Sequence, residues 1–135
     1  MKIAFIFVLS SVLAFPNTVN TWRHDQCRYE TLQNATWTDY EVTRTIRCAV
    51  DHWPVLGGVD KAISVAQCES GLEANSENGI YKGVYQQAII YWDERFTIYS
   101  PVWWELEPSI WNARSNVIVS IRMVHDNGWN GWSCA

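Results

Sequence analysis

The sequence has 135 residues, of which 48% are hydrophobic and 18% charged, and its formal net charge is −4. This length fits one domain, and the apolar fraction supports a packed core, which excludes global disorder. The acidic balance excludes a typical nucleic-acid partner, because phosphate binding needs a concentrated basic face. It also disfavours a broadly bactericidal enzyme, because anionic cell walls attract cationic proteins.

The first residues have the pattern of an export signal. Lys2 provides the positive start, residues 3–13 are almost continuously apolar, and Val12-Leu13-Ala14 has the spacing of a cleavage site. A membrane anchor is the competing interpretation, but this run is too short to cross about 30 Å of hydrocarbon. We therefore expect a signal peptide over residues 1–14 and a secreted mature protein without stable membrane insertion. Loss of Lys2 would change the net charge to about −5.

The four cysteines are interpreted in the light of export. An even number of Cys in a small secreted domain predicts disulfides, and four cysteines allow three pairings among which the sequence does not select. Zinc is the competing interpretation, but neither the cysteines nor His24, His52 and His125 have the short spacing of a ligand set. We expect no metal site and no cofactor.

After the signal, the sequence predicts a polar arm over residues 15–37 and one domain over residues 38–135. Thr38-Asp39 can cap a first helix, whose apolar residues recur at helical spacing as far as Trp53. A second helix is predicted over about residues 60–70, ended by Gly71 and followed by a loop over residues 72–79.

The following stretch, residues 81–111, is rich in Tyr and Trp and is broken at Pro101 and Pro108. Residues 81–87 predict a short strand or turn, and a last helix is predicted over about residues 115–126. No long alternating strand pattern is present. The predicted fold class is therefore mainly α, a compact helical domain with a small strand or turn element and stabilising disulfides.

Glu69 is the main candidate for catalysis. It follows Val65 and Ala66 by four and three residues, at the edge of the apolar face and in the last helical turn. Desolvation and the negative end of the helix dipole both disfavour a carboxylate there, and so favour the protonated acid that glycosidic cleavage needs. An ordinary exposed helical glutamate is the competing interpretation.

Aromatic residues are the second indication of sugar binding, because the C–H faces of sugars pack on Tyr and Trp rings. Core packing explains most of these aromatic residues equally well. The candidates for a binding cleft are Tyr85, Tyr91, Trp103 and Trp104.

Several motifs resemble those of lytic transglycosylases and related lysozyme-like domains. Ala66-Gln67-Cys68-Glu69-Ser70-Gly71-Leu72 resembles the Glu-Ser-Gly signature, and Gly83-Val84-Tyr85-Gln86 resembles the Gly-Leu-aromatic/Met-Gln motif. Residues 112–116 are similar to the start of the third motif. Residues 128–134 resemble the Trp-rich ending of small secreted members that carry Cys before the catalytic Glu.

The resemblance implies an α+β lysozyme-like fold and specific roles. Glu69 would be general acid and then general base, and Ser70 would orient Glu69 or a substrate group. Gln86, with the backbone around Gly83 and Tyr85, would hold the sugar.

The sequence also departs from the family pattern. Val84 replaces the usual Leu, and the Tyr-Asn pair of the third motif has no clear copy, although Asn116 or Tyr91 would partly substitute. A disulfide from Cys68 to Cys134 would fasten the end of the Glu69 helix to the chain terminus. We prefer this pairing, together with Cys27 to Cys48. The sequence itself does not select among the three possible pairings.

The function expected from the resemblance is a secreted, monomeric lytic transglycosylase that cleaves peptidoglycan. A single carboxylate suits this mechanism, whereas hydrolysis normally requires a second one, and nothing in the spacing distinguishes Glu73, Glu77, Asp93 or Glu94. The alternatives are a hydrolysing lysozyme on the same fold, a non-catalytic glycan-binding or structural domain, and a Trp-rich interaction module.

Overall fold

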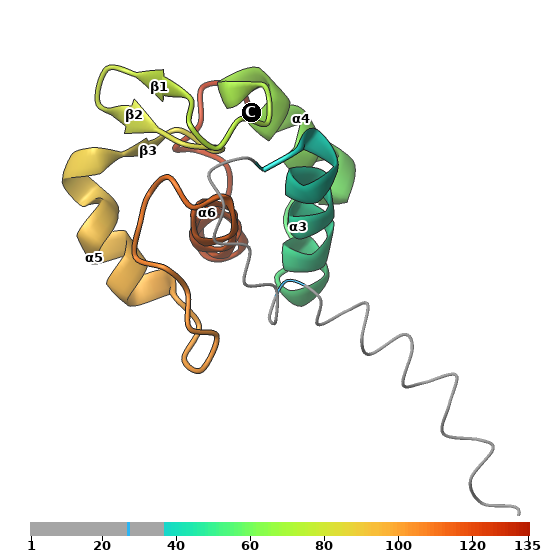
Figure 1. Ribbon diagram of the computed structural model, residues 1–135. Coiled ribbons are helices and arrows are strands. Elements are labelled where there is room, and N and C mark those ends of the chain that lie inside the picture. The colour runs from blue at the N-terminus through green and yellow to red at the C-terminus, as the bar shows by residue number, and fades with distance from the viewer. Residues whose placement is uncertain (1–26, 28–36) are drawn as a thin grey trace, which may run out of the picture.

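The computed structural model describes Cys27 and residues 37–135, so the predicted signal peptide and almost all of the predicted arm lie outside the described residues. The described part is mainly helical, with a small antiparallel sheet and two disulfides, which confirms the predicted fold class. No described helix is long and apolar enough to cross a membrane. The elements, in chain order in Figure 1, are α3 (Asp39–His52), α4 (Gly58–Ser70), β1 (Glu77–Asn78), β2 (Tyr81–Lys82), β3 (Gln87–Ala88), α5 (Ile89–Tyr99) and α6 (Ala113–Asn127).

Helix α3 begins and ends as its sequence predicts. The Thr38 hydroxyl accepts a hydrogen bond from the Glu41 amide at 3.2 Å, which satisfies one of the unpaired N–H groups of the first turn. Val42, Ile46 and Ala49 form the buried stripe. Pro54 follows the last turn and prevents the helix from continuing.

Helix α4 ends where a glycine adopts a left-handed conformation. Gly71 has φ +65°, and its N–H donates to the Gln67 carbonyl at 2.9 Å. Such a conformation favours glycine, because a side chain would be strained there. The helix therefore stops directly after Glu69 and Ser70, which places both residues in its last turn.

The three short strands form one sheet in the order β1-β2-β3, with Glu77 opposite Lys82 and Lys82 opposite Gln87. The predicted strand or turn over residues 81–87 is thus β2, the following turn and the start of β3. The predicted loop over residues 72–79 is wrong at its end, because Glu77-Asn78 pairs with β2. Lys82 also forms an ion pair with Glu77 across these strands.

Helix α6 passes through the centre of the domain, between α3 and α5 (Figure 1). Val117, Ile118 and Ile121 are fully buried, as the predicted apolar stripe requires. Polar residues between them are buried as well, because neighbouring elements cover this helix on several sides. One of these residues is Arg114, whose Nε donates to the Cys27 carbonyl and whose Nη2 donates to the Trp104 carbonyl.

The start of α6 depends on a side-chain cap, because the Asn112 side-chain oxygen accepts the Ser115 amide at 3.0 Å. We expect Asn112→Ala to lower the free energy of unfolding by about 1 kcal/mol and Asn112→Gly by only a few tenths. Denaturant titration would measure both changes. Asn75→Ala, in the exposed turn after α4, is the matched control, and equal losses at positions 75 and 112 would contradict the capping role.

Candidate functional site

Glu69 lies in the last turn of α4 with a half-buried side chain. Its Oε1 accepts the backbone N–H of Cys134 at 3.3 Å. The neighbouring residue, Cys68, forms a disulfide with Cys134, and the two Cα atoms are 5.9 Å apart. The carboxyl group is therefore held from one side by the chain segment that the disulfide fastens to α4, while part of the side chain stays accessible to solvent.

Both disulfides have the pairing that was preferred, since Cys27 is bonded to Cys48 and Cys68 to Cys134. Cys27, Cys48 and His52 bring three potential ligand atoms within 4.8 Å of one another. The two sulfur atoms are bonded to each other, however, and a disulfide does not supply the thiolates that metal ions bind. This cluster is therefore a covalent link between α3 and the segment that precedes it.

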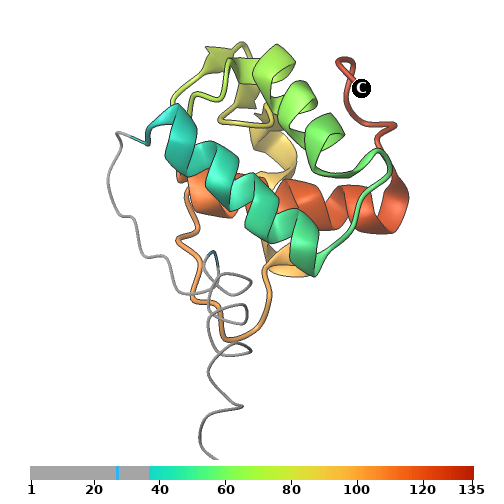
Figure 2. The same ribbon diagram turned by 90° about the vertical axis from the view of Figure 1, so that its right-hand side faces the viewer.

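Residues 128–135, which we call the C-terminal strap, run along α4 from its beginning to its end (Figure 2). At the beginning, Trp129 donates its indole N–H to the Leu56 carbonyl at 2.9 Å. In the middle, Trp132 donates its indole N–H to the Tyr85 carbonyl at 2.9 Å. The disulfide fixes the other end of the strap to α4. The strap therefore connects α4 with the turn between β2 and β3.

Ser70 forms a second connection to the same turn. Its hydroxyl lies 2.6 Å from the Val84 carbonyl, to which it donates, and 3.2 Å from the Ala66 carbonyl. Ser70 and Trp132 thus hold neighbouring carbonyls of the turn beside the end of α4. In the structure Ser70 positions this turn, and its hydroxyl bonds to backbone atoms rather than to Glu69.

Gln86 closes the turn between β2 and β3. It has φ +51°, and its Nε2 donates to the carbonyls of Gly83 at 2.8 Å and Ser76 at 3.2 Å. The side chain is half-buried. The amide nitrogen therefore secures the hairpin, and Gln86 lies directly after the two residues whose carbonyls Ser70 and Trp132 bind.

The Asn116 side chain, in the first turns of α6, holds the hairpin against this helix. Its Oδ1 accepts the Tyr85 amide at 2.9 Å, and its Nδ2 donates to the carbonyls of Lys82 at 3.2 Å and Ile110 at 3.0 Å. The side chain is fully buried. The suggestion that Asn116 contacts a ligand is therefore wrong, because its amide is already bonded to three backbone groups.

Gly83 allows this close approach. It has φ +80°, and an added Cβ would lie 2.4 Å from the Asn116 Nδ2 and 2.8 Å from the Ile110 carbonyl oxygen. A side chain at this position would meet both a buried amide and backbone. The lack of a side chain at position 83 thus lets the turn pack directly on α6.

Tyr85 is a core residue and not a cleft residue, contrary to the expectation. Its side chain is fully buried, its hydroxyl donates to the Ala62 carbonyl at 2.7 Å, and its ring packs against Trp129 and Trp132. Burial raises the pKa of its phenol. Trp104 is also buried, against His52 and Trp53, so neither ring offers a face to a sugar.

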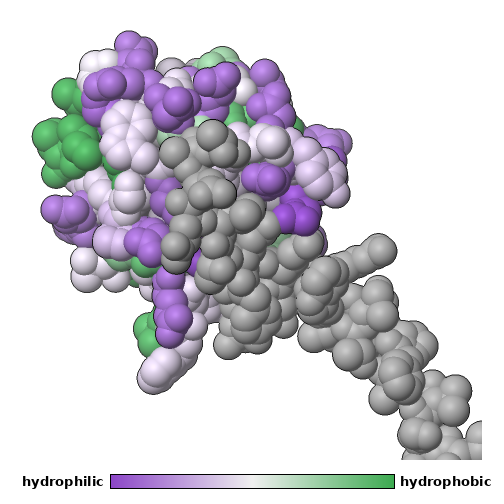
Figure 3. Space-filling view, in the orientation of Figure 1, coloured by the Kyte–Doolittle hydropathy of each residue, from purple (hydrophilic) through white to green (hydrophobic). Residues whose placement is uncertain are grey.

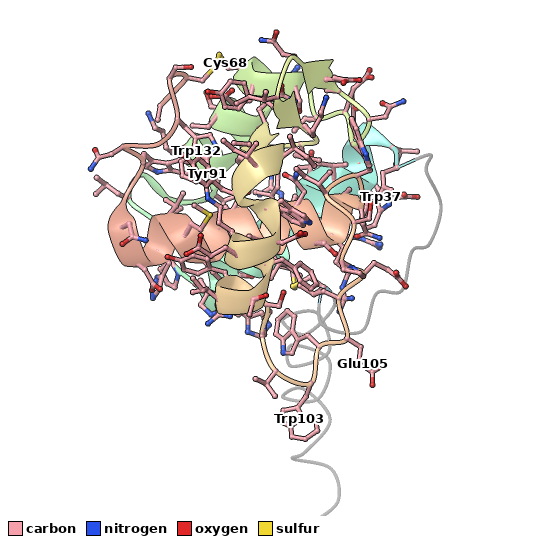
Figure 4. The ribbon with its side chains drawn as sticks, turned by 90° about the vertical axis from the view of Figure 1, so that its left-hand side faces the viewer. Trp37, Cys68, Tyr91, Trp103, Glu105 and Trp132 are labelled. Atoms are coloured by element: carbon pink, nitrogen blue, oxygen red, sulfur yellow. A yellow bond between two sulfur atoms is a disulfide. The ribbon has the colours of Figure 1, made fainter. Side chains whose placement is uncertain are left out.

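The two remaining cleft candidates are exposed, but in different places. Tyr91 lies on α5, where the Arg95 guanidinium covers its ring at 5.1 Å. Trp103 lies at the end of the domain away from Cys68 and Trp132 (Figure 4) and is therefore not near the end of α4. Figure 3 shows hydrophobic side chains gathered over the hairpin and α5, where Ile80, Ile89 and Ile90 are exposed.

The candidates for a second carboxylate are on the surface. Glu77 is engaged by Lys82, while Glu73 is exposed in the turn after α4, and Asp93 and Glu94 are exposed on α5. Within the described part of the chain, none of these four side-chain carboxylates hydrogen-bonds to Glu69 or to the strap. Sequence reasoning missed the positioning role of Trp132. The signal for it is an indole N–H two residues before Cys134, since a buried indole needs an acceptor.

The whole chain was compared with known proteins. It matches no protein-family model, no curated protein and no solved structure. The resemblance to lytic transglycosylases therefore rests on the motifs themselves.

The close contact at Gly83 can be tested with a matched pair of glycine variants. We expect Gly83→Ala to lower the free energy of unfolding by about 3 kcal/mol, because it combines a strained φ with overpacking of a buried site. Gly131→Ala is the control, because nothing lies within 4 Å of a Cβ added there. Equal stability of the two variants in denaturant titration would show that the turn does not pack on Asn116 as described.

The buried phenol of Tyr85 predicts a dependence of stability on alkaline pH. Because its pKa is raised in the folded state, the neutral phenol contributes fully below the unfolded-state pKa of about 10, and this contribution is lost as the pH rises above that value. At pH 7 we expect Tyr85→Phe to cost about 1 kcal/mol through the lost bond to Ala62. Above pH 10 the wild-type protein should lose up to about 1.4 kcal/mol per pH unit relative to that variant.

Unfolding free energies at pH 7, 10 and 11 measure this difference. Tyr81→Phe serves as the control, since Tyr81 is 47% exposed. A gap between wild type and Tyr85→Phe that stays constant across this pH range would contradict the burial of the phenol.

Proposed function

We propose that this domain is a secreted lytic transglycosylase that cleaves the glycan strand of peptidoglycan, with Glu69 as its catalytic carboxyl group. The observation that carries the proposal is the placement of Glu69. Its half-buried carboxyl group ends α4, accepts the Cys134 amide, and lies next in sequence to Ser70, which binds the Val84-Tyr85-Gln86 turn. The two disulfides support an oxidising compartment.

The reaction needs one group that first gives and then takes a proton. The Glu69 carboxylic acid protonates the glycosidic oxygen, and the bond between that oxygen and the anomeric carbon breaks. The resulting carboxylate then removes the proton from the 6-hydroxyl of the muramoyl residue. That oxygen bonds to the anomeric carbon, which produces a 1,6-anhydro end and restores the acid.

The surroundings of Glu69 suit this cycle. The Cys134 amide holds Oε1, so the proposed proton transfer uses Oε2. A carboxyl group fixed in this way loses little orientational freedom when it meets the bond to be cleaved. No second carboxylate is required, because the nucleophile belongs to the substrate.

A non-catalytic glycan-binding or structural domain is the second candidate. It is favoured by the buried positions of Tyr85 and Asn116 and by the backbone bonds of Ser70. These residues stabilise the hairpin whether or not a reaction takes place. A hydrolysing lysozyme would share Glu69 and differ in the attacking nucleophile.

The decisive variant is Glu69→Gln, which keeps an acceptor for the Cys134 amide and removes the transferable proton. We expect it to release soluble muropeptides from purified peptidoglycan at a rate lower by about 100-fold or more, the usual range for loss of a general acid. Mass spectrometry of the products from the unmutated protein should show anhydro ends. Glu94→Gln, an exposed position on α5, is the matched control and should keep full activity.

The products separate the candidate functions. Reducing ends in place of anhydro ends would assign hydrolysis to the same site. Binding to peptidoglycan without release, in a protein whose disulfides are shown to be formed, would support the non-catalytic domain. Equal activity of Glu69→Gln and the unmutated protein would remove Glu69 from the reaction.

A further inference from the structure

A pocket of about 460 Å³ lies between the beginning of α4 and the C-terminal strap. Neither Glu69 nor Gln86 lines it. Its lining residues are Leu56, Gly57, Lys61, Trp129, Asn130, Trp132 and Ala135. The pocket is therefore separate from the catalytic carboxyl group, although both adjoin the strap.

The pocket has an aromatic and apolar wall. The rings of Trp129 and Trp132 stand perpendicular to each other, with centroids 5.7 Å apart. Their indole N–H groups are already bonded to the carbonyls of Leu56 and Tyr85, which fixes both ring planes. Leu56 is 81% exposed at the rim. Trp129 is buried and supports the half-buried Trp132. A rigid indole ring such as that of Trp132 packs well on the apolar C–H face of a sugar ring.

The pocket also contains one cation. Lys61 is half-buried, and none of the described residues forms an ion pair with it. Its side-chain carbons lie against Gly57, since a Cβ added to that glycine would be 2.6 Å from the Lys61 Cβ. The first carbons of the Lys61 stem are thereby packed against residue 57, where a side chain would not fit. An ammonium group in a pocket with an apolar wall favours an anionic ligand.

We propose that this pocket is an accessory site for an acidic sugar, with the pyranose ring on the half-buried Trp132 indole and the carboxylate on the Lys61 ammonium group. Asn130 supplies an exposed amide for the hydroxyl or acetamido groups of the same ligand. The identification of that sugar as a muramoyl residue rests on the proposed function. The pocket itself stands on its own lining.

The strap connects this pocket with Glu69. Lys61 and Cys68 are seven residues apart and therefore lie on the same side of α4, along which the strap runs. From Lys61 to Glu69 the helix advances roughly 12 Å. A glycan strand bound in the pocket would thus be held at a distance from the bond that Glu69 cleaves, and remote binding of this kind helps to position the reacting part.

Two monosaccharides test the proposal directly. N-acetylmuramic acid and N-acetylglucosamine differ by one lactyl ether, which carries the carboxylate. The indole N–H signals of Trp129 and Trp132 in a ¹H–¹⁵N NMR titration report binding in the pocket, with no need for cleavage. We expect N-acetylmuramic acid to shift these signals and to bind about fivefold more tightly than N-acetylglucosamine, as a partly exposed ion pair allows. This preference should shrink at high salt.

Two lysine variants provide the matched comparison. Lys61→Gln should abolish the preference for N-acetylmuramic acid. Lys82→Gln should keep it, because the Lys82 ammonium group pairs with Glu77 on the hairpin. Leu56→Ser changes an exposed residue at the rim and should weaken the binding of both sugars without unfolding the domain.

The outcomes distinguish this proposal from the proposed function. Equal affinity for the two sugars, indole signals that do not move, or a preference that survives Lys61→Gln would each overturn the accessory site. Binding in the pocket by a protein that releases no muropeptides would support the site and contradict the transglycosylase. Cleavage that depends on Glu69 with no binding in the pocket would do the reverse.

Discussion

The side-chain amide of Asn116 is the interaction on which the rest of the domain depends. It joins the central helix to the hairpin by accepting one backbone N–H, from Tyr85, and donating to two carbonyls. A buried amide with all of these partners satisfied is stabilising, whereas removing it would leave several buried backbone groups unpaired. The turn that carries Gln86 is therefore set by α6, and the contact is possible because residue 83 has no side chain.

The C-terminal strap provides the second constraint on the same turn. The Cys68–Cys134 disulfide closes a loop across 66 residues, which in the chain-entropy model contributes about 4 kcal/mol. Trp132 adds a hydrogen bond to the Tyr85 carbonyl, and Cys134 adds one to Glu69. The surroundings of Glu69 thus come from three parts of the chain, and α4 alone would not define them.

Much of the fold follows from the sequence, because α3, α4 and α6 have both helical periodicity and end signals. The sheet was harder to predict, since its strands have two residues each and show no alternation over that length. The cleft roles of Tyr85 and Trp104 and the ligand role of Asn116 were wrong for a shared reason. A sequence shows which side chains can bind a sugar, but not whether these side chains are already buried by or hydrogen-bonded to other parts of the protein. Glu69 and Gln86 remain predicted site residues, and the structure adds the strap as their support.

The bond between Glu69 and Cys134 has a consequence for the order of assembly. Synthesis proceeds from the N-terminus, so Glu69 is added to the chain before the strap. The amide that holds the Glu69 carboxyl group lies 65 residues further along the chain. The Glu69 carboxyl group is therefore held in this way only once the strap lies beside the end of α4. A chain in which the Cys68–Cys134 disulfide has not formed lacks the covalent link that keeps the Cys134 amide beside Glu69.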